Sequence, residues 1–200
     1  MTKKIAIIDY KVGNIKSIVN AVLLFDTQVI LTSNHDEIMS SDGIILPGVG
    51  SYIHGMSNLK NLSLDKTIYE YANTNKPIMG ICLGMQLLME GSEEFQKTKG
   101  LGLSKGQVKK ISLQKNLSLP HIGWETVEFN NSALNSDYFF CHSYSAIPNN
   151  QDDILATSKY GSQIICAAVK RDNITGFQFH PEKSGNYGLQ LIKQFIDDIK

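Results

Sequence analysis

Residues 77–89 read PIMGICLGMQLLM, and this stretch predicts the centre of the fold. Residues 77–81 form an apolar run, whereas the residues after Cys82 have the apolar spacing of a helix. Gly80 and Gly84 flank the cysteine, and glycine lets a chain bend tightly because it has no Cβ atom. The stretch therefore predicts a strand, a sharp turn and a helix, with a thiol at the turn.

Two roles are open to Cys82. A serine in a G-x-S-x-G turn serves as the nucleophile of hydrolases, and a cysteine in that position can do the same chemistry. A buried cysteine that only packs is the structural alternative. The flanking glycines and the change from strand to helix favour the nucleophile.

Strand and helix patterns alternate along the first half of the chain. Short apolar runs predict strands at residues 4–9, 29–31 and 43–46, and helical spacing is found at residues 13–25, 36–39, 56–62 and 64–73. This alternation is typical of a parallel sheet covered on both faces, in which ligands bind beyond the carboxyl ends of the strands.

The second half is dominated by strand patterns. They lie at residues 107–113, 122–129, 138–140, 163–169 and 174–179, and a last helix is expected at residues 187–199. We expect an antiparallel part packed beside the parallel core, hence an α/β fold. A chain of 200 residues is long enough for one well-buried domain, so residues 1–200 are predicted to be a single domain.

Composition narrows the function. Nineteen basic and nineteen acidic residues cancel, which argues against nucleic acid or a membrane surface as the main partner. The N-terminus turns acidic at Asp9, too early for a signal peptide, and no apolar run is as long as a membrane span. Cys82, Cys141 and Cys166 are widely spaced, without a metal or disulfide pattern. We therefore expect a cytoplasmic protein that binds a small molecule or another protein, with no metal and no cofactor.

A second chemical signal lies at residues 175–182, which read TGFQFHPE. Phe177 and Phe179 share one face of the predicted strand, so His180 should point with Gln178 to the other. Glu182 follows closely, and a cysteine nucleophile needs a base whose tautomer is fixed by a third group. Alone, His-Pro-Glu would be an ordinary exit from a strand. Together with the cysteine turn, it favours a catalytic pair.

Residues 47–51, PGVGS, follow the predicted third strand. Two glycines around one valine leave backbone amides free to face a ligand at the carboxyl end of the sheet. A simple turn explains the same residues equally well, because Pro-Gly is common in loops. Both interpretations stay open on this evidence.

The two motifs together resemble class I (triad-type) glutamine amidotransferases, which carry G-x-C-x-G-x-Q and a distal H-P-E; here they are residues 80–86 and 180–182. Residues 46–50 (LPGVG), 120–124 (PHIGW), 142–144 (HSY) and 179–185 (FHPEKSG) are similar to the glutaminase subunits of imidazole glycerol phosphate synthases. The resemblance runs over essentially the whole chain. It implies a flavodoxin-like three-layer fold, with a mostly parallel central sheet and an antiparallel extension in the second half.

The resemblance also implies roles for single residues. Cys82 would attack the side-chain amide of L-glutamine, His180 would act as acid and base, and Glu182 would hold His180. A γ-glutamyl thioester would then be hydrolysed to glutamate, with release of ammonia. The amides expected to bind the oxyanion are those of Leu83 and of the correctly oriented loop at Val49 and Gly50. The positions that resemble a glutamine-binding set are Gln86, Gly50, Ser143 and Tyr144.

A protein partner is implied in the same way. In this family the glutaminase docks on a (β/α)8-barrel cyclase subunit, which uses the ammonia to make imidazole glycerol phosphate and aminoimidazole carboxamide ribotide in histidine biosynthesis. The positions that match residues near that interface are Asn14, His121, Trp124, Tyr138 and Lys183.

Three departures from the family pattern lie near the expected docking face. Lys11 stands where a glycine is usual, Glu125 stands where an asparagine is usual, and FFCH at residues 139–142 replaces the commoner YFVH. A paralogue that supplies ammonia for acetamidino modification of a bacterial surface sugar is therefore an alternative. A non-catalytic amidotransferase-like binding protein and a cysteine protease of the related superfamily are further alternatives.

Overall fold

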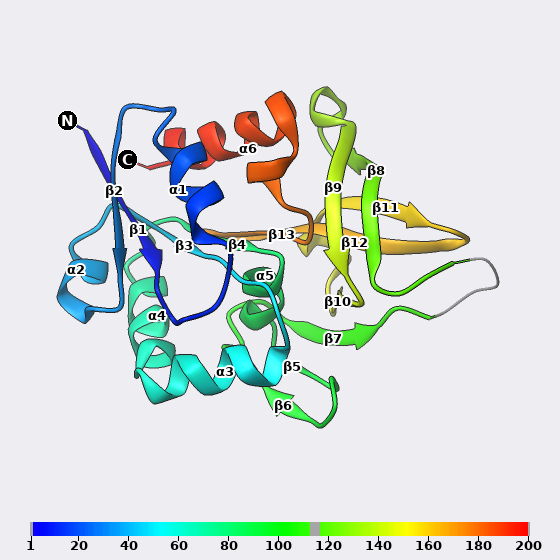
Figure 1. Ribbon diagram of the computed structural model, residues 1–200, viewed down its shortest axis with the longest axis horizontal. Helices are drawn as coiled ribbons and strands as arrows, with labels where there is room; N and C mark the ends of the chain where they lie inside the picture. Colours follow the sequence, from blue (N-terminus) through cyan, green and yellow to red (C-terminus); the bar gives the residue numbers. More distant parts are fainter. Residues whose placement is uncertain (1, 113–116, 200) are drawn as a thin grey trace.

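A nine-stranded sheet forms the middle of the molecule, in the order β2-β1-β3-β4-β13-β12-β11-β8-β9. The structure is a computed structural model that describes residues 2–112 and 117–199 (Figure 1). The strands of this sheet are β1 (Lys3–Ile8), β2 (Thr27–Thr32), β3 (Gly43–Leu46), β4 (Ile78–Ile81), β8 (His121–Phe129), β9 (Ser136–His142), β11 (Ile154–Tyr160), β12 (Gln163–Arg171) and β13 (Ile174–Phe177). The first five strands in this order, β2, β1, β3, β4 and β13, pair in parallel. The strands from β12 to β9 in this order pair antiparallel, as the sequence predicted.

Helices cover both faces of the parallel half, which gives the expected three layers (Figure 1). One face carries α1 (Ile15–Val22) and α6 (Gly185–Asp197). The other carries α2 (His35–Met39), α3 (Tyr52–Asn61), α4 (Leu64–Ala72) and α5 (Leu83–Leu88). Among the described residues, no helix is long and apolar enough to cross a membrane.

The buried strands supply both halves of the core. Along β1, Ile5 and Ile7 pack with α1 and α6, whereas Ala6 and Ile8 pack on the opposite face. Successive side chains of a strand point to opposite faces, so a continuous apolar run serves a sheet that is covered on both sides. This is why the short strands of the first half read as apolar runs rather than as alternating patterns.

Strand β13 is the last strand of the chain, yet it lies between β4 and the antiparallel part of the sheet. It pairs in parallel with β4, so that Phe177 stands opposite Ile81. The backbone N–H of Cys82 donates to the carbonyl of Phe177 at 2.7 Å. This pairing brings residues 178–182 beside the cysteine turn, although nearly a hundred residues of chain separate them.

A smaller sheet packs beside the main one in the order β10-β7-β5-β6. Its strands are β10 (Tyr144–Pro148), β7 (Gly106–Lys110), β5 (Gly91–Ser92) and β6 (Thr98–Lys99). Strand β10 follows β9 almost directly, so the chain passes from the large sheet to the small one at Ser143. The junction carries the predicted glutamine-binding positions at residues 143 and 144.

The sequence patterns placed some boundaries wrongly and missed several strands. Strands β5, β6, β10 and β11 were not predicted, because two are very short and β11 has polar residues within it and shifts register against β12. The strand expected at residues 107–113 ends at Lys110, and residue 113 lies outside the described residues. The helix expected at residues 13–25 is shorter, because Gly13 has a φ of 118° that a helix does not allow.

The turn at Cys82 leaves no room for a side chain at Gly84. A Cβ atom there would lie 1.8 Å from the carbonyl oxygen of Leu46 in β3. Gly185 is a useful contrast, since a Cβ atom there would meet nothing within 4 Å but its φ is 60°. Glycine is therefore required at position 84 because a side chain does not fit, and it is favoured at position 185 because of its backbone conformation.

We expect Gly84→Ala to destabilise the fold much more than Gly185→Ala. Overpacking against fixed backbone should cost about 3 kcal/mol or more, whereas the left-handed conformation should cost about 1 kcal/mol. Urea unfolding followed by circular dichroism would measure both. Equal losses of unfolding free energy would contradict the close approach of Leu46 to the turn.

Candidate active site

Cys82 occupies a strained turn between β4 and α5. Its φ is 52° and its ψ is −109°, outside the usual regions for a residue with a side chain. The hydrogen bond from its N–H to Phe177 and the tight fit of Gly84 hold the backbone there. Strained backbone of this kind is found at functional sites, and here it places the thiol at the carboxyl end of the parallel sheet.

His180 and Glu182 form a buried pair beside this turn. His180 Nδ1 lies 2.8 Å from Glu182 Oε1, and the two side chains are 4% and 1% exposed. His180 follows β13, and Glu182 belongs to the short 3-10 helix η3 (Pro181–Lys183), which turns its carboxylate back to the ring. The structure thus brings together the cysteine, histidine and glutamate that the sequence singled out.

The pKa of His180 is raised by its surroundings. Burial alone would lower that pKa, but hydrogen bonds and charges of Cys82 and Glu182 outweigh burial and raise it to about 10. Glu182 Oε2 has no hydrogen-bond partner among the described residues, so the hydrogen bond of this carboxylate is the one between Oε1 and His180 Nδ1. The raised pKa favours the protonated form of the imidazole.

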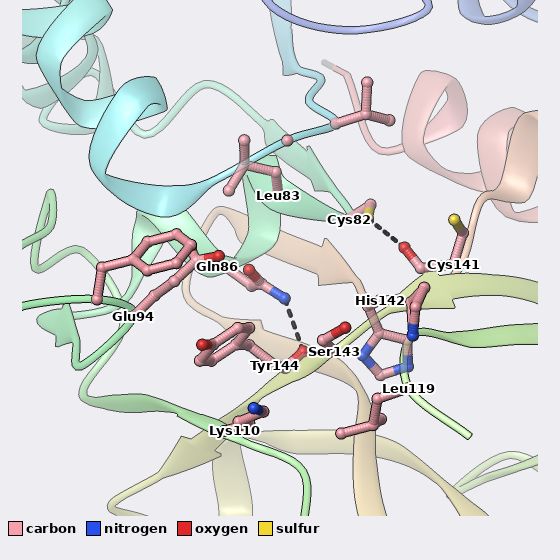
Figure 2. Close-up of a pocket in the computed structure, with 14 residues that line it drawn as sticks. Cys82, Leu83, Gln86, Glu94, Lys110, Leu119, Cys141, His142, Ser143 and Tyr144 are labelled. Atoms are coloured by element: carbon pink, nitrogen blue, oxygen red, sulfur yellow. Dashed lines mark hydrogen bonds between the residues drawn. The ribbon is translucent and has the colours of Figure 1, made fainter. Parts of the chain in front are cut away.

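A cavity of about 480 Å³ opens in front of the thiol. Figure 2 shows Cys82 at its edge and Gln86 and Tyr144 projecting into it. This volume is within the range of small-molecule sites. Its lining includes the predicted oxyanion and substrate-binding positions, namely Val49, Gly50, Leu83, Gln86, Ser143 and Tyr144.

A buried glutamine that was not among the predicted site residues connects two of them. Gln178 Nε2 lies 3.8 Å from Cys82 Sγ, and Gln178 Oε1 accepts from Gln86 Nε2 at 3.0 Å. Gln86 Nε2 also donates to the carbonyl of Tyr144 at 2.8 Å (Figure 2). The alternation of the strand predicted that Gln178 lies on the same face as His180. It gave no indication of the residues that Gln178 contacts.

The amides predicted to bind an oxyanion are not all free. The N–H of Leu83 donates to the carbonyl of Gly48 at 3.3 Å, so this predicted donor is occupied within the chain. Val49 is 42% exposed and Gly50 has a φ of 119°. Reorientation of the peptide after Gly48 would release the Leu83 amide toward the cavity.

Two charged side chains at the rim of the cavity were also not predicted. Glu94 and Lys110 line it with opposite charges (Figure 2). Glu94 Oε2 accepts a hydrogen bond from the N–H of Tyr52, the first residue of α3, at 2.6 Å. Such a pair suits a ligand that carries both an ammonium and a carboxylate. Within the described residues, no group of His, Cys, Asp and Glu side chains could hold a metal ion.

The residues predicted near a partner interface separate into surface and interior positions. Asn14, Trp124 and Lys183 are exposed, with Trp124 at 54%. His121 and Tyr138 are buried at 1% and 0%, so any effect of these two on a partner must pass through neighbouring residues. The departures at residues 11 and 125 both form ion-pair contacts: Lys11 lies 2.9 Å from Asp9, and Glu125 lies 3.3 Å from His121.

Comparisons with known proteins agree with this geometry. The family model described as "Glutamine amidotransferase class-I" matches residues 6–199. "Imidazole glycerol phosphate synthase subunit HisH" of Oceanobacillus iheyensis is 44% identical, covering 98% of this chain and 100% of that protein. A protein named "Imidazole glycerol phosphate synthase subunit HisH 1" from Methanococcus maripaludis is 41% identical over 98% of this chain and 100% of its own length.

Solved structures show the same fold. "Structure of PurLQS from Thermotoga maritima" superposes with a TM-score of 0.77 and 18% identity, covering all of both chains. A structure described as "Crystal structure of glutamine amidotransferase" superposes with a TM-score of 0.75 and 14% identity, covering 96% of this chain and 97% of the other. At these identities the likeness supports the three-layer α/β fold alone.

The first prediction from this geometry concerns the proton on His180. Glu182→Gln removes the negative charge that raises the pKa of His180, so the imidazole should lose its proton at a lower pH than in the parent protein. Titration of the imidazole 15N signals by NMR would measure the change. Glu93→Gln, at an exposed position, is the matched control and should leave the titration unchanged.

The second prediction concerns Gln178. Gln178→Met keeps most of the side-chain volume but removes the N–H near Cys82 Sγ, so the sulfur loses a hydrogen-bond donor. Alkylation of Cys82 by iodoacetamide near neutral pH should slow by about threefold to tenfold. Peptide mass mapping is needed to follow Cys82 alone, because Cys141 is exposed and reacts with the same reagent.

An exposed glutamine provides the control for this second experiment. Gln28→Met in β2 should leave the alkylation rate of Cys82 unchanged. An unchanged rate in Gln178→Met as well would show that Gln178 does not affect the reactivity of Cys82.

Proposed function

The chain belongs to the class-I glutamine amidotransferase family, and from this premise we propose that it is the glutaminase subunit of an imidazole glycerol phosphate synthase. The observation that carries the proposal is Cys82, which lines the cavity, beside the buried pair of His180 and Glu182, in a chain 44% identical to such a subunit along its length. We propose further that residues 1–200 form one amidotransferase domain.

Glutamine would bind with its side-chain amide toward Cys82. Gln86, Ser143 and Tyr144 line the cavity and offer both donors and acceptors to the substrate, and Gly50 leaves room for it beside the loop. At the rim, the carboxylate of Glu94 would bind the α-ammonium group and Lys110 the α-carboxylate. These two charges would select an amino acid over a simple amide.

The chemistry follows from proton transfer by His180. His180 takes the proton of the Cys82 thiol, and the resulting thiolate attacks the amide carbon. The carbonyl oxygen becomes an oxyanion that takes hydrogen bonds from the amides of Leu83 and the loop at Val49 and Gly50. His180 then gives its proton to the nitrogen as the C–N bond breaks, which releases ammonia and leaves a γ-glutamyl thioester. A water molecule, activated by the now neutral His180, hydrolyses the thioester to glutamate.

The Leu83 amide has to leave the Gly48 carbonyl before this oxyanion site is complete. Losing one such donor typically costs about a hundredfold or more in turnover. The resting arrangement of residues 48–50 should therefore hydrolyse glutamine slowly. A signal that reorients this loop would raise the rate.

That signal would come from a partner. The relatives are named as subunits, and we propose that this chain likewise docks on a (β/α)8-barrel cyclase subunit that consumes the ammonia in histidine biosynthesis. Exposed side chains of the docking face would be Asn14, Trp124 and Lys183, of which Lys183 Nζ lies 5.8 Å from the centre of the Phe139 ring and Trp124 packs edge-on against the same ring. Free thiols at Cys82, Cys141 and Cys166 support a cytoplasmic location.

The alternatives can be weighed against the same observations. A non-catalytic binding protein would not need the complete catalytic triad, and a cysteine protease would not need the Gln86–Gln178 pair beside the thiol. A role in surface-sugar modification would use the same glutaminase chemistry with another partner. It differs only at the docking face, where Lys11 and Glu125 lie.

We expect Cys82→Ser to abolish release of glutamate from glutamine, assayed with the cyclase subunit present. Cys141→Ser is the matched control, because the Cys82 thiol faces the backbone carbonyl of Cys141, which the substitution keeps, and it should stay active. Hydrolysis that persists in Cys82→Ser would refute the nucleophile.

Complementation tests the pathway separately. The gene should restore growth without histidine to a bacterium that lacks its own glutaminase subunit, whereas the Cys82→Ser form should not. Glutaminase activity without complementation would favour the surface-sugar role.

A further inference from the structure

A line of polar side chains outside the triad connects the surface of β8 with the glutamine cavity. Glu125 Oε1 lies 3.3 Å from His121 Nε2, and His121 Nδ1 lies 3.2 Å from His142 Nε2. His142 Nδ1 then lies 2.8 Å from the carbonyl oxygen of Tyr144, which also accepts from Gln86 (Figure 2). One end of the line is the half-exposed Glu125, and the other end lines the cavity.

Strand pairing and packing hold these rings in place. His121 and His142 stand directly opposite each other on β8 and β9. The His121 ring stacks on Tyr160 with centroids 3.9 Å apart and on Phe140 with centroids 5.2 Å apart. Between His121 and Glu125 on the same face of β8, Gly123 contributes no side chain.

The directions of the hydrogen bonds determine where a proton must be. His142 Nδ1 faces a carbonyl, so it carries the hydrogen, and burial holds the pKa of His142 down to about 4, which keeps the ring neutral. Its Nε2 is then an acceptor, so His121 Nδ1 must donate to it. A neutral His121 would consequently present a bare Nε2 to the carboxylate of Glu125, where two acceptors would face each other.

One additional proton, on His121 Nε2 or on Glu125, removes this conflict. The two atoms form a close ion-pair contact rather than an aligned hydrogen bond, and His121 Nε2 has no other partner among the described residues. The titratable and charged groups around the pair are Tyr138 and His142 on β9, Tyr160 and Lys159 on β11 and Glu128 on β8, with His180 beyond His142. Burial of the His121 ring outweighs the charge of Glu125, so the pKa of His121 lies below its usual value.

We propose that Glu125 and His121 share one exchangeable proton and act as positioning residues that hold His142, and through it the Tyr144 carbonyl, in the arrangement that receives glutamine. This inference rests on the proposed function of the cavity. When pH rises and the proton leaves, His121 keeps a single N–H. The Glu125 carboxylate competes for this N–H more strongly than neutral His142 does, so the link from His121 to His142 is lost.

The consequence is a pH-dependent affinity for substrate. Because the pKa of His121 lies below its usual value, loss of one supporting hydrogen bond should raise the KM for glutamine by about threefold to tenfold between about pH 4.5 and pH 7.5, with a smaller change in kcat. The change belongs to binding, because the line ends at the Tyr144 carbonyl and Gln86 rather than at His180.

Glu125→Gln separates this proton from every other effect of pH. The glutamine amide has the same shape and donates an N–H to His121 Nε2 at every pH, so His121 Nδ1 stays with His142. The KM of this variant should remain at the low-pH value of the parent across the whole range. The 15N signals of His121, assigned by NMR, should also stop titrating there.

Glu128→Gln is the matched control, since Glu128 lies on the same strand and lines the same surface hollow but has no contact with His121. It should keep the parental pH profile. Thermal midpoints of both variants would confirm that each is folded. The kinetics are measured on the chain together with its cyclase subunit, and the NMR on the chain alone.

Two results would overturn the proposal. One is an active Glu125→Gln enzyme whose KM still rises with pH as in the parent, and the other is a His121 that does not titrate in the parent protein. A parent chain that hydrolyses no glutamine would instead refute the proposed function, and the NMR titration would still decide whether the pair shares a proton.

Discussion

The parallel pairing of β4 with β13 is the interaction on which the rest of the structure depends. It aligns the ends of two strands that are remote in sequence, and the hydrogen bond from Cys82 to Phe177 fixes the cysteine turn against the segment that carries His180. Gly84 allows the turn to lie directly against the carbonyl of Leu46 in β3, the neighbour of β4 on its other side. Backbone contacts from β13 and from β3 therefore fix the cysteine turn on both sides. Because these contacts involve no side-chain torsion, they hold the position of the thiol firmly.

Around this centre several polar side chains are buried and hydrogen-bonded to one another. Gln86 and Gln178 bond to each other, His180 bonds to Glu182, and His121 bonds to His142. A buried polar group without a partner costs free energy, so each of these contacts restricts its members to one arrangement. Such networks give the site its geometry, and they also make it sensitive to a proton or to the orientation of one peptide.

The sequence was a good guide to local structure and to the chemistry of the site. The strand, turn and helix at residues 77–89 and the helices on either side were found where apolar spacing predicted them, with boundaries displaced by a few residues. Strand β11 was missed because its polar residues do not alternate cleanly and its pairing with β12 shifts register. Gln178 was placed on the correct face of its strand, yet its partners could not be predicted, because they come from α5 and from the cysteine turn.

What the sequence determined by itself is the set of chemical groups and the short-range backbone around them: a thiol between two glycines, a histidine two residues before a glutamate, and a glycine-rich loop after a strand. These depend on neighbours only a few positions away. The order of the strands was decided by tertiary structure alone, and with it the meeting of Cys82 with His180 and the line from Glu125 to the glutamine cavity. Those contacts join residues from separate strands, and they form only when the whole sheet buries its two faces at once.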